Sequence, residues 1–227
     1  MAQPEPRFFR IATAMADPSR ARMLATLLGG EYRSAGELAA AAGITAQAAS
    51  SQLTHLTDST LVVVRQQGRH KYFALADAEV AHALEALSLL AERDDVSRRW
   101  EKPAYQPLKC ARRCYGHMAG ETGVAQFDML VRCQYLQMTH GSLQLTPAGH
   151  QWLMALGLRL PAGGGNRFAY PCMDWSERRD HLAGTLAKVL LAHYLDKNWL
   201  RADAGSRALK ITPQGQRELL PLLAATL

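Results

Sequence analysis

The sequence of 227 residues lacks long apolar runs and has only four cysteines. No apolar run is long enough to span a bilayer, which excludes a transmembrane helix. The apolar segment 8–16 leads into Asp17-Pro18 rather than into a cleavage site, so we expect a cytoplasmic protein with no membrane partner. The cysteines, which are then expected to be reduced thiols rather than a disulfide framework, are Cys110, Cys114, Cys133 and Cys172.

Motifs of common enzyme classes are absent as well. The cysteines and histidines have no oxyanion loop, glycine-rich phosphate cradle or paired-carboxylate motif around them. We therefore expect no catalytic residues, no required cofactor and no enzymatic activity.

Positive charge is present and unevenly distributed. The chain carries a formal net charge of +6. Residues 1–75 contain eight Lys or Arg against five acids, and residues 98–114 contain six against one. Basic charge that is concentrated in this way favours a polyanionic partner.

Residues 34–75 contain the pattern of a winged helix-turn-helix. A capping box at Ser34 begins one helix, and Thr45 is the expected N-cap of a second helix, which runs to about Leu56. An apolar run, a basic glycine turn and a strand follow within residues 61–75. In this order of elements the second helix is shaped to enter the major groove of DNA.

The polar face of the second helix and the basic hairpin are the expected DNA contacts. Small polar side chains can donate to and accept from base edges, and the basic side chains would meet phosphates or the minor groove. Taken alone, the helix also fits an ordinary solvated amphipathic helix, but the caps and the hairpin favour DNA binding. The candidates are Thr45, Gln47, Ala48, Ser50, Ser51, Gln52 and His55 in the helix, and Arg65, Arg69 and Lys71 in the hairpin.

A long helix is expected after the hairpin, at residues 76–93. Val80, Leu84, Leu87 and Ala91 lie on one stripe of it. Little of the small domain remains for this stripe to pack on, so we expect it to form a homodimer interface. A two-fold symmetric dimer would match a palindromic operator in double-stranded DNA.

Residues 108–227 contain an internal repeat. The sequences His117-Met-Ala-Gly120 and His181-Leu-Ala-Gly184 each precede an apolar helix, a hairpin and a Thr-Pro-x-Gly sequence that begins another helix. We therefore predict a mainly α protein with small β-hairpin wings, of the α+β class. Its parts are a winged helix-turn-helix DNA-binding and dimerisation domain (1–93), a linker (94–107) and an effector-sensing C-terminal domain of two winged-helix-like repeats (108–227).

Six short segments lie in a recognisable order and spacing. They are Met15-Ala-Asp-Pro-Ser-Arg20, Glu37-Leu-Ala39, Gly43-Ile-Thr45, Ser50-Ser-Gln-Leu53, Leu61-Val62 and Gln67-Gly-Arg-His-Lys-Tyr-Phe73. With these segments the first 93 residues resemble the ArsR/SmtB family of bacterial winged-helix repressors, and the resemblance implies the fold and DNA binding. Residues 172–184 look like the C-terminal extension of an ArsR-like subgroup. This resemblance does not indicate which ligand, if any, the extension binds.

The sequence departs from the family pattern at two places. The resemblance places two metal-binding cysteines within residues 31–38, but this stretch contains none, so the family's original metal site is absent. Thr60 stands where a glycine usually precedes the first strand of the hairpin.

Thiols and imidazoles occur at the start of both copies of the repeat. Cys110, Cys114 and His117 are four and three residues apart, so on a helix they would share one face. Cys172 and His181 begin the second copy. We expect these groups to line a shared pocket that binds a soft metal or metalloid, or that reacts with an oxidant or electrophile.

A different interpretation of the same residues stays open. Cysteines often pack as small hydrophobes, and the two histidines could serve as helix caps. The effector would then be a neutral organic molecule, or there would be none. Trp175, beside Cys172, is a candidate for stacking on an aromatic ligand, although such a tryptophan is more often part of the core.

The predicted function is that of a DNA-binding transcriptional regulator, expected to be a homodimeric repressor whose operator affinity is modulated by an effector sensed in the C-terminal domain. The alternative is a redox, electrophile or soft metal(loid) sensor that uses Cys110, Cys114 and Cys172. A thiol enzyme fused to a DNA-binding module is a remote alternative. The sequence leaves open the effector, which could be a small molecule or a soft metal, the operator, and whether the protein represses or activates.

Overall fold

The computed structural model describes residues 8–91, 103, 105–139, 142–160, 168–203 and 206–225. The chain divides into two compact units, residues 1–84 and residues 85–227, which we call the N-terminal and C-terminal units. Their boundary lies inside one helix, α5 (Ala78–Ala91). The predicted linker, 94–107, falls largely outside the described residues, and its bounds stay a prediction. Among the described helices, none is both long enough and apolar enough to cross a bilayer.

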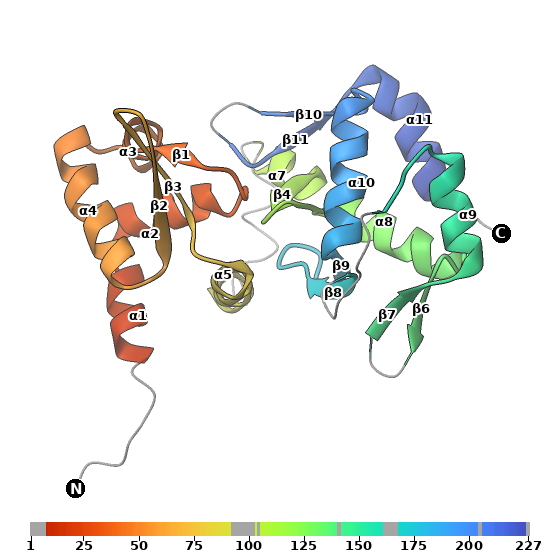
Figure 1. Cartoon of the computed structure of the whole chain (residues 1–227), viewed down its shortest axis with the longest axis horizontal. Coiled ribbons are helices and arrows are strands. Elements are labelled where there is room, and N and C mark those ends of the chain that lie inside the picture. Colours follow the sequence, from red (N-terminus) through yellow and green to blue (C-terminus); the bar gives the residue numbers. More distant parts are fainter. Residues whose placement is uncertain are drawn as a thin grey trace, which may run out of the picture. The chain divides into compact units, whose positions relative to one another are not determined.

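The N-terminal unit contains a helix-turn-helix followed by a β-hairpin (Figure 1). The hairpin belongs to an antiparallel sheet with the strand order β1-β3-β2. The elements before α5 are α1 (Phe8–Met15), α2 (Pro18–Leu27), β1 (Arg33–Ser34), α3 (Ala35–Ala42), α4 (Ala46–Asp58), β2 (Val62–Gln67) and β3 (His70–Leu75). The predicted winged helix-turn-helix is therefore confirmed.

Side-chain caps determine where these helices begin. Asp17, Ser34 and Thr45 precede α2, α3 and α4, and each accepts a hydrogen bond from a backbone N–H in the first turn. Glu37 completes the capping box with Ser34. Helix α3 ends at Gly43, whose φ of 70° lies in the left-handed region that glycine adopts at little cost. The predicted helix starts at Ser34 and Thr45 are confirmed.

Thr60 replaces a glycine at the end of α4 and keeps the glycine-like backbone. Its φ is 62°, a conformation that a β-branched residue rarely adopts. Helix α4 ends at Asp58 and β2 begins at Val62, so this left-handed residue turns the chain from the helix into the hairpin. Thr60 thus adopts a backbone conformation that glycine would adopt at lower cost.

The described part of the C-terminal unit has one order of elements that occurs twice: hairpin, helix, hairpin, helix. A short helix, α7 (Gln106–Cys110), comes first, and each hairpin is antiparallel. The first series is β4 (Arg112–Cys114), β5 (His117–Ala119), α8 (Glu121–Arg132), β6 (Leu136–Thr139), β7 (Ser142–Leu145) and α9 (Pro147–Ala155). The second is β8 (Tyr170–Met173), β9 (Asp180–Ala183), α10 (Thr185–Asp196), β10 (Leu200–Ala202), β11 (Leu209–Ile211) and α11 (Pro213–Ala224).

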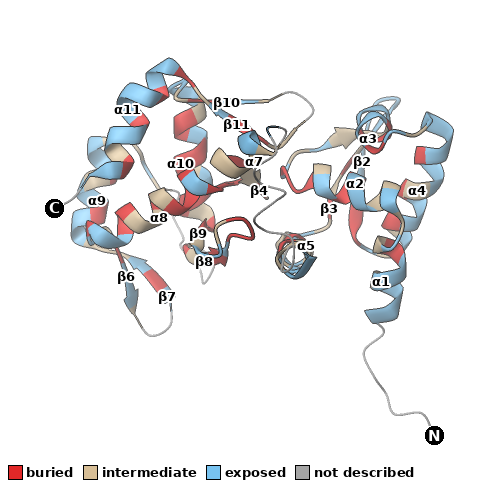
Figure 2. Cartoon of the chain, turned by 180° about the vertical axis from the view of Figure 1, so that it is seen from behind, coloured by how far each residue is buried: buried red, intermediate tan, exposed pale blue. Residues whose placement is uncertain are grey.

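The two series share one apolar core. Leu130 of α8, Leu190 and Tyr194 of α10, and Leu219 of α11 are all wholly buried in it. The inner sides of α8 and α10 are accordingly marked as buried in Figure 2. Cys133, which follows the last residue of α8, is also part of this core.

The recurring Thr-Pro-x-Gly sequence has the same structural role in both series. Thr146 caps α9 and Thr212 caps α11, and each hydroxyl accepts a 3.0 Å hydrogen bond from the N–H of the glycine three residues later. A Cβ atom at Gly149 or Gly215 would meet the backbone carbonyl just before β6 or β10. Close approach of helix and hairpin therefore requires glycine at these positions.

We predict that Gly215→Ala destabilises the protein by about 1 to 3 kcal/mol, because the added methyl group would meet the Trp199 carbonyl. Gly36→Ala is the matched control, since Gly36 also lies in a first helical turn but has open space around the Cβ position. The control substitution should stabilise the protein by up to about 1 kcal/mol. Denaturant unfolding followed by circular dichroism measures both changes, and equal effects of the two would contradict the close contact.

Candidate functional site

Most residues predicted to contact DNA lie on the outer side of α4. Ala49, Leu53 and Leu56 of this helix are buried in the N-terminal unit, which turns the opposite side outward. The residues exposed at the start and on the outer side are Thr45, Gln47, Ala48, Ser50, Ser51 and His55. This surface is accessible to base edges and phosphates.

Gln52 differs from its neighbours on this helix. It is half-buried, and its Oε1 accepts a 2.7 Å hydrogen bond from Nη1 of Arg20 on α2. The Arg20 guanidinium also donates to the backbone carbonyls of Ala14 and Thr13. Arg20 therefore orients the Gln52 amide, a role that the sequence pattern did not indicate.

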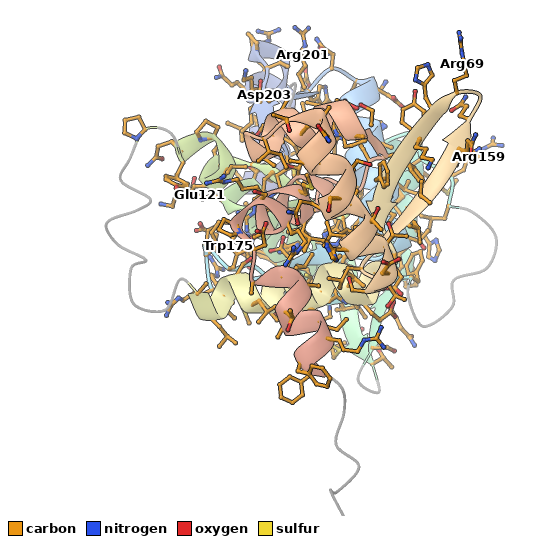
Figure 3. The ribbon with its side chains drawn as sticks, turned by 90° about the vertical axis from the view of Figure 1, so that its left-hand side faces the viewer. Arg69, Glu121, Arg159, Trp175, Arg201 and Asp203 are labelled. Atoms are coloured by element: carbon orange, nitrogen blue, oxygen red, sulfur yellow. The ribbon has the colours of Figure 1, made fainter. Side chains whose placement is uncertain are left out.

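The basic hairpin of β2 and β3 extends from the same unit. Its strands pair from Val62 with Leu75 to Gln67 with His70, and Gly68 in the turn has a φ of 59°. Arg69 lies at the tip of the hairpin and points away from the ribbon (Figure 3). The three predicted phosphate contacts, which are all exposed, are Arg65, Arg69 and Lys71.

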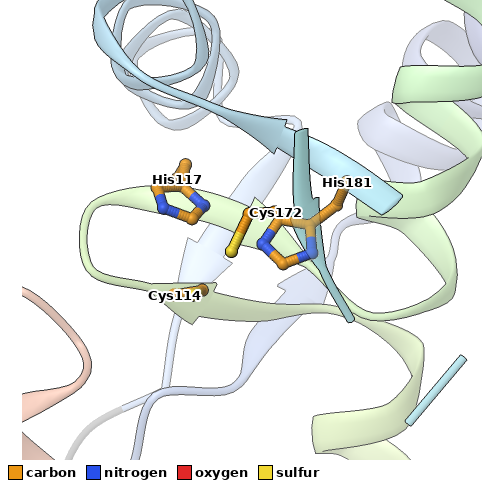
Figure 4. Close-up of side chains that lie close together, drawn as sticks. All are labelled: Cys114, His117, Cys172 and His181. Atoms are coloured by element: carbon orange, nitrogen blue, oxygen red, sulfur yellow. The ribbon is translucent and has the colours of Figure 1, made fainter. Parts of the chain in front are cut away.

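The C-terminal unit contains a buried cluster of two cysteines and two histidines. Cys114 on β4 pairs directly with His117 on β5, and Cys172 on β8 pairs directly with His181 on β9. One candidate ligand atom from each residue lies within 4.8 Å of the other three, and all four residues are buried. The side chains of the two hairpins point toward one another in Figure 4. We call these residues the Cys/His cluster.

The cluster corrects one interpretation of the sequence. Cys114 and His117 do not share a helix face with Cys110, which is the last residue of α7. They lie on two strands joined by Tyr115 and Gly116, which have φ values of 46° and 88°. Two central residues with positive φ are typical of a tight hairpin turn, which gives the same spacing of three as a helical turn. The sequence spacing alone did not distinguish a helical turn from a hairpin turn.

Asp174 joins the two hairpins of the cluster. Its Oδ1 accepts a 2.7 Å hydrogen bond from Arg112 Nη2, and its Oδ2 accepts one of 2.7 Å from the Gly120 N–H. The same Oδ2 lies 3.4 Å from His181 Nδ1. Ser176 donates to Oδ1 through both its N–H and its hydroxyl. The ion pair between Asp174 and Arg112 is wholly buried, and the sequence did not indicate that these two residues pair.

Trp175 lies beside this ion pair. Its ring is buried, with the guanidinium carbon of Arg112 4.4 Å and that of Arg207 5.8 Å from the ring centroid. Arg207 also donates a 2.7 Å hydrogen bond to Glu85, the first residue of the C-terminal unit. The aromatic surface of Trp175 therefore packs against arginines, which is a cation–π arrangement.

The charged groups of the cluster depend on one another. Burial alone would lower the pKa of His181, but the Asp174 carboxylate and the Cys172 sulfur raise it to about 9. Burial would raise the pKa of Asp174, yet His181 and Arg112 hold it well below its usual range. The paired thiols shift in opposite directions, since their contact lowers the pKa of Cys172 and raises that of Cys114. A thiolate beside an imidazolium is thus favoured, with protons that a metal ion could displace.

Comparison with known proteins extends these observations. A model described as a helix-turn-helix domain matches residues 15–65. The uncharacterized HTH-type transcriptional regulator YdfF of Bacillus subtilis (strain 168) is 35% identical over 213 residues, which cover 93% of this chain and 94% of YdfF. The HTH-type transcriptional regulator CmtR of Mycobacterium tuberculosis (strain ATCC 25618 / H37Rv) is 43% identical over 75 residues, 33% of this chain and 63% of CmtR.

A solved structure shows a likeness over a shorter part. It is the homodimeric winged helix-turn-helix DNA-binding domain of Mb0332 from Mycobacterium bovis, a possible ArsR-family transcriptional regulator. The sequences are 27% identical, the likeness covers 40% of this chain and 91% of that one, and the TM-score is 0.36.

The helix-turn-helix match and the N-terminal fold define a winged helix-turn-helix transcriptional regulator. Because the likeness to YdfF extends over nearly the whole chain, the family follows as well. The chain belongs to the ArsR family of HTH-type transcriptional regulators, as the resemblance of residues 1–93 to that family predicted. The relatives are named as regulators rather than enzymes, and the likeness to YdfF includes the C-terminal unit.

We predict that Asp174→Ala destabilises the protein by about 3 to 5 kcal/mol, because it leaves the Arg112 guanidinium buried without its carboxylate. The double variant Arg112→Met with Asp174→Leu removes both charges and should be less destabilised than the single variant. Urea unfolding measures both. The single variants Arg112→Met and Asp174→Leu complete the cycle, and a double variant that loses the sum of their two effects would show that the residues do not interact.

Proposed function

We propose that this regulator is a homodimeric repressor that binds a palindromic operator through α4 and the β2–β3 hairpin. In this arrangement α4 enters the major groove with Thr45, Gln47 and Ser50 near its leading end. Ser51, Gln52 and His55 follow on the same helix, and Arg65, Arg69 and Lys71 neutralise phosphates beside it. The observation that carries the proposal is the exposed polar side of α4 next to an exposed cationic hairpin.

Exposed apolar side chains support the homodimer. Phe8 and Phe9 on α1 are 68% and 63% exposed, and Leu87 and Leu90 on α5 are 43% and 48% exposed. Large apolar side chains gathered on the outside of helices favour association with another copy. Dimerisation would place two copies of α4 for two half-sites of one operator.

The C-terminal unit is the proposed effector-sensing part. Its repeated order of elements and its two Thr-Pro-x-Gly turns support an origin from two winged-helix-like copies. The Cys/His cluster lies at the first hairpins of the two series, where a ligand would contact both. We infer that effector binding at this place changes the affinity of the dimer for its operator.

We predict that Arg65→Ala combined with Arg69→Ala weakens binding to all DNA sequences and reduces the salt dependence, because two phosphate contacts per protomer are lost. The slope of log Kd against log salt should fall by about one for each lost contact. Fluorescence anisotropy with the DNA upstream of the protein's own gene, titrated against salt, measures the slope.

The matched control for this experiment removes the same charge from the C-terminal unit. Arg201→Ala with Arg217→Ala replaces two exposed arginines that the proposal places away from DNA. The control should reproduce the wild-type salt slope. If the salt titration of the Arg65 and Arg69 double variant also superimposes on that of the wild type, the hairpin does not bind phosphate.

A further inference from the structure

We propose that Cys114, His117, Cys172 and His181 form a tetrahedral binding site for Zn²⁺ or a closely similar soft divalent ion, and that Asp174 positions His181 for it. The inference deepens the proposed function, because the ion would be the effector that changes operator affinity. Metal binding itself can be measured without DNA, so the two claims can fail separately.

The spacing of the four donors is close to that of a zinc site. With bonds of about 2.3 Å to sulfur and about 2.1 Å to nitrogen, tetrahedral ligand atoms stand about 3.3 to 3.8 Å from one another. The candidate atoms in the cluster already lie within 4.8 Å of one another. Side-chain adjustments of about 1 Å would complete the site.

The donor set selects the class of ion. Thiolate and imidazole suit zinc-like and softer ions, whereas Mg²⁺ and Ca²⁺ prefer oxygen ligands. Binding would displace two protons from the cluster, so that two thiolates, two neutral imidazoles and one dication form a site without net charge. A site without net charge is favourable here because Cys114 and His181 are both 0% exposed, and a net charge away from solvent is costly.

His181 provides a second, independent observation. Its side chain is completely buried, and among the described residues its Nε2 makes no hydrogen bond of normal geometry, although the Cys172 sulfur lies close enough to raise the pKa of the ring. Buried polar atoms are almost always satisfied in native proteins, by protein, water or a ligand. A metal ion bonded to Nε2 would remove this deficit.

Asp174 would act on the ion through the imidazole. Its Oδ2 faces His181 Nδ1 at 3.4 Å, so an N–H on Nδ1 leaves Nε2 free to bind the metal. Carboxylates in this position fix the tautomer and orientation of metal-bound histidines. Asp174 is itself fixed by Arg112 and by the Gly120 N–H, so its position does not depend on the metal.

The site needs ligands from both series of elements, because the β4–β5 hairpin belongs to the first series and the β8–β9 hairpin to the second. Each hairpin contributes one cysteine and one histidine at directly paired positions, and the hairpins approach through β5 and β9. Four protein ligands leave no open position, which is typical of structural and regulatory sites rather than catalytic ones. A bound ion would therefore bridge the two series.

The first test measures metal binding to the full chain. We expect the reduced protein to bind one Zn²⁺ per chain, by elemental analysis after dialysis, and to give thiolate-to-cobalt charge-transfer and tetrahedral d–d absorption with Co²⁺. Cys114→Ser and Cys172→Ser should each lose the tight site and reduce the charge-transfer intensity. Cys110→Ser is the control, because Cys110 is not among the clustered ligands, and it should match the wild type.

The outcomes separate the claims. Protein that binds no Zn²⁺ or Co²⁺, or that binds them equally well in all three serine variants, would overturn the site. A Cys114–Cys172 disulfide in protein prepared without reductant, with no metal bound after reduction, would also overturn it. Metal binding that leaves operator affinity unchanged would keep the site and refute the effector role. Protein that binds metal but binds no operator DNA in either the metal-free or the metal-loaded state would instead refute the proposed function.

A second test addresses Asp174. We predict that Asp174→Asn lowers Zn²⁺ affinity about 10- to 100-fold, in a competition titration with a chromophoric chelator. The unfolding midpoint of the metal-free variant is measured alongside, and Asp128→Asn, at a partly exposed carboxylate of α8, is the control. A loss of stability without any change in metal affinity would make Asp174 a structural residue only.

Discussion

The buried Asp174 carboxylate is the interaction on which the arrangement of the C-terminal unit depends. It accepts from Arg112 on β4, from the backbone at the end of β5 and from Ser176 in its own loop, so one side chain joins both hairpins. A carboxylate without solvent is unfavourable unless such partners surround it. Because the partners lie on separate segments, they hold the strands that carry the cysteines and histidines in a defined place.

The two units differ in where they place their polar and charged side chains. The N-terminal unit must present polar and cationic side chains to solvent, so it buries only one side of α4 and leaves the hairpin exposed. The C-terminal unit instead buries an ion pair, in which the Arg112 guanidinium is compensated by the Asp174 carboxylate and by the Ser176 hydroxyl. Helix α5 continues across the boundary between them, and Glu85 on this helix is paired with Arg207.

Much of the N-terminal unit could be predicted because its signals are local. Asp17, Ser34, Gly43 and Thr45 act within a few residues of themselves, so their effect is visible in the sequence. The Cys/His cluster depends on the packing of two hairpins that lie far apart in the sequence, and a spacing of three residues is shared by a helical turn and a tight hairpin. The residues were therefore identified, but their hairpins were not. The Arg112–Asp174 pair spans 62 positions and leaves no local pattern.

The division of the donors between two hairpins has a consequence for biosynthesis. Cys114 and His181 are separated by α8, β6, β7 and α9, so no short stretch of the chain holds a complete set of ligands. During synthesis only Cys114 and His117 would be available as ligands until β8 and β9 have left the ribosome. Maturation of the cluster would thus be a late event, and an occupied centre would report that the two hairpins have come together.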